Sequence, residues 1–149
     1  MDKYNDEQVS SANKELEKRL AQDREEWKKK VKSLVSDLRE VRKLSEVQVM
    51  MLSYRQTLLD KVGEFKNTVY KRKMSWDRYY KAKFRDYTLS YDIKLTGGER
   101  SHFISTDLAP LKLQINMLES HIEYYQECIR TLDNMAFAVR NRIRLEDDM

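Results

Sequence analysis

A regular stripe of apolar residues in the last third of the chain constrains the fold most. Between Leu111 and Ile143, apolar residues recur at spacings that alternate four and three. This is a heptad pattern with Ile115, Ile122, Ile129, Ala136 and Ile143 at the a positions, and Leu111, Leu118, Tyr125, Leu132 and Val139 at the d positions. Such a seam requires a partner helix. The partner is either the first helix of the chain folded back, or a copy of the same helix.

The first half of the chain carries a second helical pattern. Apolar residues follow one another at spacings of three and four from Leu16 onward, which is typical of an amphipathic helix. Gly63 is the weak point of this pattern, because glycine in a helix costs roughly 1 kcal/mol relative to alanine. We therefore expect one long helix over 14–86, broken either at 41–47 or near Gly63. The segment 1–13 shows no periodicity and is expected to be disordered.

The pattern changes between these two helical regions. In 87–96, YTLSYDIKLT, apolar and polar residues alternate, which predicts a β-strand. Gly97 and Gly98 then have the composition of a two-residue hairpin turn, after which the chain could return as a second strand. The sequence thus predicts a short β-hairpin over 87–104, followed by a C-terminal helix over 107–145.

The composition favours a mainly α fold. Charged residues make up 36% of the chain, and three Gly and one Pro offer few places to turn. We expect a single elongated helical domain over 1–149, with two long amphipathic helices in heptad-like packing joined by the hairpin. A chain this polar has little apolar surface to bury alone, and 47–52 (VQVMML) is apolar nearly all round. We therefore expect it to assemble as an oligomer.

Positive charge is concentrated in the stretch 66–86. It carries eight Lys or Arg against two Asp, a net charge of +6, whereas the whole chain has a net charge of +4. Five aromatic residues are interleaved with these cations, a combination that suits nucleic acid because cations contact phosphates and rings stack on bases. On a helix, Trp76, Tyr80 and Phe84 continue the buried stripe, while Tyr70 falls at its edge.

A separate face of this helix carries cations of one sign. They form a row that spans roughly 21 Å at the rise of an α-helix, and we name Lys71, Arg78, Lys81 and Arg85 the basic row. An ordinary solvated face mixes signs, so a single-signed row favours an anionic ligand. The candidate nucleic-acid-binding residues are Lys71, Arg78, Lys81, Lys83, Arg85 and Tyr79, with Tyr70 as a second candidate stacking ring. No base-reading pattern is present, which predicts phosphate contacts without sequence preference.

The sequence offers no signature of catalysis. It lacks a phosphate-binding glycine loop, a nucleophile elbow and a metal-binding cluster, so we expect neither an enzyme nor a cofactor nor a metal site. His102 and His121 are isolated and are interpreted as ordinary polar residues, and the single Cys128 excludes an internal disulfide. The polar start and the absence of a long apolar run predict a cytoplasmic protein without membrane association.

Two segments resemble a known protein family. They are KAKFRDY at 81–87 and the amphipathic segment 105–147, which has Tyr124 and Tyr125 at its middle and the run Phe137-Ala138-Val139-Arg140 near its end. From about residue 50 onward, the chain resembles the UvsY-type recombination mediators of large tailed bacteriophages. This resemblance implies a protein that binds single-stranded DNA and assembles into a ring-like homo-oligomer. It also places the DNA contacts among Lys81, Lys83 and Arg85.

The resemblance further implies that the protein helps a RecA-like recombinase load onto DNA covered by single-strand-binding protein, in the cytoplasm of the bacterial host. Composition and spacing alone predict only that the protein is basic and helical and forms oligomers. They fit a second function equally well, namely that of a coiled-coil scaffolding protein whose basic face binds an acidic protein partner.

Overall fold

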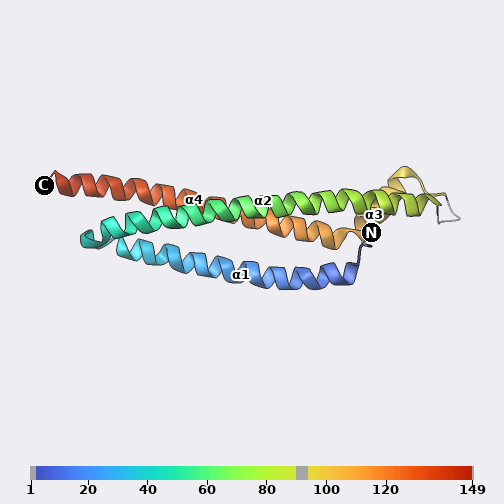
Figure 1. Cartoon of the computed structure of the whole chain (residues 1–149), viewed down its shortest axis with the longest axis horizontal. Helices are drawn as coiled ribbons and strands as arrows, with labels where there is room; N and C mark the ends of the chain where they lie inside the picture. The colour runs from blue at the N-terminus through green and yellow to red at the C-terminus, as the bar shows by residue number, and fades with distance from the viewer. Residues whose placement is uncertain (1–2, 90–93, 149) are drawn as a thin grey trace. The chain divides into compact units, whose positions relative to one another are not determined.

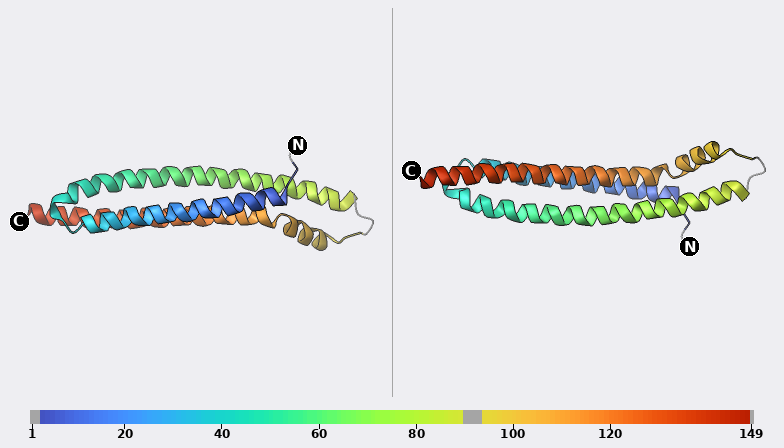
Figure 2. Two further views of the ribbon diagram at one scale, coloured as in Figure 1. Left: turned by 90° about the horizontal axis from the view of Figure 1, so that it is seen from below. Right: turned by 90° about the horizontal axis from the view of Figure 1, so that it is seen from above.

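The computed structural model describes residues 3–89 and 94–148, and within these residues the chain is mainly α-helical (Figure 1, Figure 2). The elements are α1 (Asp6–Asp37), the 3-10 turn η1 (Val41–Lys43), α2 (Leu44–Leu89), α3 (Gly97–Asp107) and α4 (Ala109–Asp147). No β-strand occurs in the described part of the chain. The predicted mainly α fold class is confirmed, with four α-helices in these residues instead of two.

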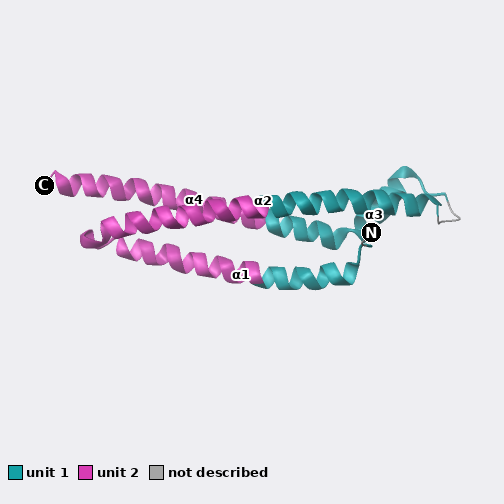
Figure 3. Cartoon of the chain, in the orientation of Figure 1, with its two compact units in different colours: residues 1–18, 66–119 teal, residues 19–65, 120–149 magenta. Residues whose placement is uncertain are grey.

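The chain divides into two compact units, and each unit takes parts of α1, α2 and α4 (Figure 3). Unit 1 contains residues 1–18 and 66–119, and unit 2 contains residues 19–65 and 120–149. The basic stretch of α2 and the whole of α3 therefore belong to unit 1, whereas the turn between α1 and α2 belongs to unit 2.

In unit 2, α1 and α2 form an antiparallel pair, and α4 lies beside both of them (Figure 2). The side chains between the three helices are buried, among them Trp27, Leu34, Val47, Met51, Leu58, Ile122, Tyr125, Leu132 and Val139. The heptad seam of α4 is thus packed against the first helices of its own chain. Of the two partners that the sequence allowed, the folded-back helix is the one observed.

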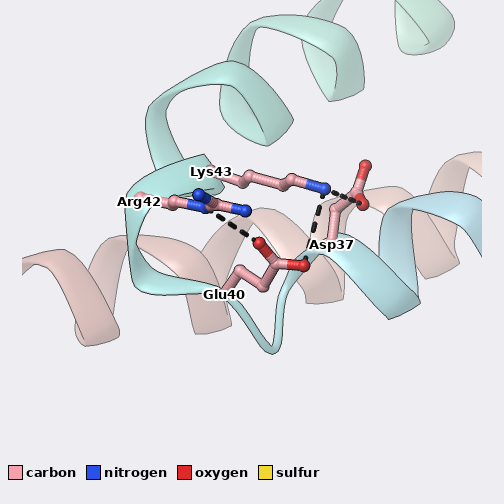
Figure 4. A network of polar contacts seen from close by, with 4 residues as sticks. All are labelled: Asp37, Glu40, Arg42 and Lys43. Atoms are coloured by element: carbon pink, nitrogen blue, oxygen red, sulfur yellow. Dashed lines mark hydrogen bonds and ion pairs between the residues drawn. The ribbon is translucent and has the colours of Figure 1, made fainter.

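The turn between α1 and α2 is held by ion pairs (Figure 4). The Lys43 ammonium lies 3.3 Å from an Asp37 oxygen and 3.5 Å from a Glu40 oxygen, and Arg42 pairs with Glu40 at 3.0 Å. The guanidinium of Arg142 on α4 donates a hydrogen bond to the carbonyl of Leu38, which satisfies one of the backbone groups left open where α1 ends. The long helix predicted over 14–86 is interrupted at 38–43, which overlaps the first of the two predicted breaks, 41–47, while α2 continues through Gly63.

In unit 1, the first turns of α1 pack against the start of α4. The Asn13 side chain is buried, donates to the carbonyl of Pro110 at 2.8 Å, and accepts from the Gln114 amide at 3.1 Å. The predicted disorder of 1–13 is wrong from Asp6 onward, because Asn13 is anchored in this way and the Asn5 side chain accepts from the Gln8 backbone at the helix start. This segment shows no hydrophobic periodicity because hydrogen bonds of the polar Asn13 side chain attach it to the start of α4.

The β-hairpin predicted over 87–104 is wrong for the described residues, and residues 90–93 of its first strand lie outside them. α2 continues to Leu89, and Gly97 and Gly98 open α3 instead of forming a turn between strands. The cause is a capping box. Thr96 Oγ1 accepts from the Glu99 backbone N–H at 3.1 Å, and the Glu99 carboxylate accepts from the Thr96 N–H at 3.4 Å.

The C-terminal helix predicted over 107–145 is present as α4, which begins at Ala109 and is preceded by α3. Pro110 lies in the first turn of α4, as expected for a residue without a backbone N–H. Ile104 and Leu108 are fully buried and attach α3 to the rest of unit 1.

Candidate nucleic-acid interface

The basic row lies exposed on the part of α2 that belongs to unit 1. All four of its side chains face solvent, and none of them forms an ion pair with a carboxylate of the described residues. Arg78 interacts locally, because it donates to Ser75 Oγ at 3.5 Å and its guanidinium lies 5.6 Å from the centre of the Tyr79 ring. The structure therefore keeps these four cations on one accessible helix face, without a carboxylate partner in the part of the chain that it describes.

Two other cations of the same stretch are paired with carboxylates. Lys73 contacts Glu119 at 2.8 Å, and Lys83 lies 3.9 Å from a carboxylate oxygen of Asp107. That same oxygen accepts a hydrogen bond of 2.6 Å from the Tyr87 hydroxyl. Lys83, a predicted DNA contact, is thus half-buried and engaged with α3, so the geometry gives it a role in attaching α3 to α2.

The aromatic residues of this stretch are more exposed than the sequence predicted. We expected Trp76, Tyr80 and Phe84 to be buried, but the first two are half-buried and Phe84 is exposed. The reason is that the last turns of α2 make their contacts with α3, which has 11 residues and buries Ile104 alone. A helix this short covers only part of the apolar face of α2.

The two candidate stacking rings differ in accessibility. The Tyr79 ring packs against Tyr4, with ring centres 5.2 Å apart, and Arg78 lies over it. Tyr70 is 63% exposed and directly precedes Lys71 in the sequence. Of the two, Tyr70 is therefore the ring that a base could reach without displacing a neighbour.

A hollow of about 500 Å³ lies along the last turns of α2. We name it the α2 hollow, and it is lined by Tyr80, Lys81, Phe84, Arg85, Thr88 and Leu89. Arg100 of α3 borders it, with the guanidinium 4.9 Å from the centre of the Phe84 ring and Nη1 donating to Thr88 Oγ1 at 3.0 Å. Two of the four residues of the basic row, Lys81 and Arg85, thus line the same hollow as the exposed Phe84 ring.

Sequence reasoning missed Phe84 and Arg100 as candidate site residues. Phe84 continued the apolar spacing of α2 and was assigned to the core, and Arg100 fell in the predicted hairpin. The signal that could have located Arg100 is the capping box at Thr96 and Glu99, which starts a helix and places Arg100 in its first turns.

A second polar cluster lies buried in unit 2. His121 Nε2 is 2.8 Å from an Asp23 carboxylate oxygen, and the Tyr125 hydroxyl donates to that oxygen at 2.5 Å. Burial lowers the pKa of His121, and the hydrogen bond to Asp23 opposes this effect. Burial also raises the pKa of Tyr125 far above its usual value. The cluster is enclosed by rings, with Phe65 stacked on His121 at 5.3 Å.

The described residues hold no group of three or more His, Cys, Asp or Glu side chains that could bind a metal ion. Among these residues, no helix has the length and apolar character needed to cross a membrane. No family model, curated protein or solved structure matches the chain. The geometry of the α2 surface is therefore the basis for assigning a function.

Proposed function

We propose that this protein binds single-stranded DNA without sequence preference, through the basic row of α2. The observation that carries the proposal is the exposure of Lys71, Arg78, Lys81 and Arg85 on one helix face without an anionic partner among the described residues. Spacings of seven, three and four residues place the cations along about 21 Å of the helix, where they can follow a phosphate backbone. Exposed rings at Tyr70 and Phe84 add surfaces on which bases can stack.

The resemblance to the UvsY-type mediators extends this proposal. In that role the protein is not an enzyme: it holds single-stranded DNA, competes for the strand with single-strand-binding protein, and presents it to a RecA-like recombinase in the host cytoplasm. A homo-oligomer would raise the effective concentration of the basic rows along one strand, so that weak contacts add up to tight binding.

A copy of the same helix, one of the two partners that the sequence allowed for the α4 seam, is not available to a homo-oligomer, because that seam is packed within the chain. One exposed apolar surface of unit 2 belongs to the segment 47–52, from which the sequence predicts assembly. Val49 is 66% exposed and Leu52 is 64% exposed, whereas Val47 and Met51 are buried. We therefore assign self-association to the exposed side chains of this segment.

A scaffolding function remains the second candidate. The same basic row would bind a carboxylate-rich protein surface, and long helices with exposed apolar side chains suit a structural partner. The two functions differ in their response to DNA, because the scaffolding function requires no affinity for a phosphate backbone.

The proposal is tested by titrating labelled single-stranded oligonucleotides of unrelated sequence at several salt concentrations. We expect similar affinity for all sequences and a steep loss on adding salt, because binding releases counterions from the strand. Changing Lys71, Arg78, Lys81 and Arg85 together to Ala should reduce the slope of log K against log[salt] by about 3, since each phosphate contact on a single strand contributes about 0.7.

A charge-matched control is available on α1. Lys14, Lys18, Lys29 and Lys32 are exposed and form no ion pair among the described residues, so changing them together to Ala removes the same charge from another surface. This control variant should retain the wild-type affinity and slope. Absence of binding by the wild-type protein at low salt would contradict DNA binding and favour the acidic protein partner.

A further inference from the structure

The Phe84 ring is exposed, although the apolar spacing of α2 predicts that it is buried. It is 39% exposed and lines the α2 hollow together with Tyr80, Thr88 and the strongly exposed Leu89. Two cations of the basic row, Lys81 and Arg85, line the same hollow. An aromatic ring in this setting offers a stacking surface next to positive charge.

Arg100 holds this ring in place. Its guanidinium lies 4.9 Å from the centre of the Phe84 ring, within the range of a cation–π contact. Its orientation is fixed by the hydrogen bond of 3.0 Å to Thr88 Oγ1. Thr88 in turn donates to the Phe84 carbonyl at 2.8 Å, which links the three residues in one cluster. The ring is therefore positioned before a ligand arrives, and this reduces the entropic cost of binding.

Among the described residues, no carboxylate forms an ion pair with Arg100. Its Nε is also buried without a hydrogen-bond partner there. Together with Lys81 and Arg85, which line the hollow, Arg100 provides three cations near one aromatic ring that have no carboxylate partner among the described residues. The hollow is thus complementary to a ligand that combines a flat ring with negative charge.

The shape of the hollow indicates how such a ligand would be attached. Its volume of about 500 Å³ lies within the range of about 300–1,000 Å³ that is typical of small-ligand sites. However, its lining comes from one face of a single helix. A free nucleotide would bury little of its surface on such a wall, whereas a base within a strand is also held by contacts along the rest of the row.

We propose that the α2 hollow receives one unstacked base of a single strand, which stacks on Phe84 while Lys81 and Arg85 contact the adjacent phosphates. This inference rests on the proposed DNA binding and adds a specific site to it. It also predicts a preference for single strands, because the bases of a duplex are already stacked on one another and are not free to enter the hollow.

The test compares two oligonucleotides of equal length and charge, one of thymidines and one in which abasic sites replace the bases. The wild-type protein should bind the base-containing strand about 5- to 150-fold more tightly, the ratio expected for stacking of one base. Phe84→Ala should reduce this ratio towards one, and Phe84→Trp should retain it. The quadruple change in the basic row should instead weaken binding of both strands.

Phe137 supplies the matched control, because it is an exposed ring on α4, outside the basic stretch of α2. Phe137→Ala should leave the ratio unchanged, and circular dichroism should show wild-type helix content for every variant. If Phe84→Ala keeps the wild-type ratio, or if Phe137→Ala abolishes it, the base does not bind at Phe84, while salt-dependent binding of the abasic strand would still support the proposed function. If the wild-type protein binds neither strand, both proposals are wrong.

Discussion

At the scale of single residues, His121 is a titratable group whose surroundings lower its pKa. It is 1% exposed, it contacts Asp23 through Nε2, and its Nδ1 has no hydrogen-bond partner among the described residues. Asp23 and Arg24 face it from α1, Phe65 covers it from α2, and Tyr124 and Tyr125 adjoin it on α4. Desolvation outweighs the attraction of Asp23, so the folded protein favours the neutral imidazole.

This burial predicts that acidification destabilises the protein in a defined pH window. The pKa of His121 is lower in the folded state than the value of about 6.5 in the unfolded chain. The contribution of neutral His121 to the free energy of unfolding is therefore complete above pH 6.5. It is lost as the pH falls through that value, by at most about 1.4 kcal/mol per pH unit. Urea unfolding at several pH values between 7.5 and 5.5 measures this loss.

Two variants assign the effect to His121. His121→Gln should flatten the dependence in this window, because it removes the titrating group while keeping a donor for Asp23. His102→Gln should retain the wild-type dependence, because His102 is exposed on α3 and is the other histidine of the chain. If the wild-type protein becomes more stable on acidification, the charged pair with Asp23 is favoured and our assignment is reversed.

The residues of the candidate site differ in how far the sequence could predict their environment. The basic row was predictable because helical periodicity alone places its members on one face, and the structure shows that face exposed. The engagement of Lys83 with Asp107 and the exposure of Phe84 were not predictable. Both depend on α3, whose existence and short length the sequence patterns did not reveal.

At the scale of elements, α3 depends on its N-cap more than the long helices do. It has 11 residues and begins with Gly97 and Gly98, each of which costs about 1 kcal/mol relative to Ala in a helix interior. The capping box formed by Thr96 and Glu99 offsets part of this cost. We predict that Thr96→Ala destabilises α3 by about 1 kcal/mol. Hydrogen exchange of the α3 amides measures this change.

Thr96→Ser is the matched control, because serine retains the hydroxyl that accepts from the Glu99 N–H. It should keep wild-type protection of the α3 amides. Since α3 carries Arg100 and Asp107, Thr96→Ala should also loosen the contacts that these residues make with Phe84 and Lys83. Unchanged exchange in Thr96→Ala would mean that packing of Ile104 and Leu108 alone holds the helix.

The elements also show why some sequence predictions succeeded and others failed. The seam of α4 is regular over its whole length, which makes the helical pattern unambiguous. The helix was therefore predicted to within two residues at each end. The predicted strand rested on ten alternating residues, too few to outweigh the helical pattern that continues to Leu89. The two glycines suggest a hairpin turn, and the capping box at Thr96 and Glu99 is the sequence signal that indicates a helix start instead.

At the scale of the whole molecule, the use of the α4 seam within the chain changes the expectation for assembly. A seam that is buried inside one chain cannot also join two chains, so self-association depends on the apolar side chains that remain exposed. Val49 and Leu52 lie on the same face of α2 and are among the most exposed large apolar side chains of unit 2. Surface apolar residues gathered in this way are typical of interaction sites.

We predict that changing Val49 and Leu52 to Gln converts a homo-oligomer into monomers. Light scattering measures the mass, and the helix content and urea midpoint should stay close to wild type because both side chains are exposed in the single chain. Phe137 and Leu145 are similarly exposed on α4 in unit 2, so changing them to Gln provides the matched control and should leave the mass unchanged.

The monomeric variant should bind a short oligonucleotide with wild-type affinity but lose affinity for a long strand, because only the long strand contacts several basic rows at once. A wild-type protein that is monomeric at micromolar concentration, or an oligomer that dissociates in the control variant instead, would contradict this assignment.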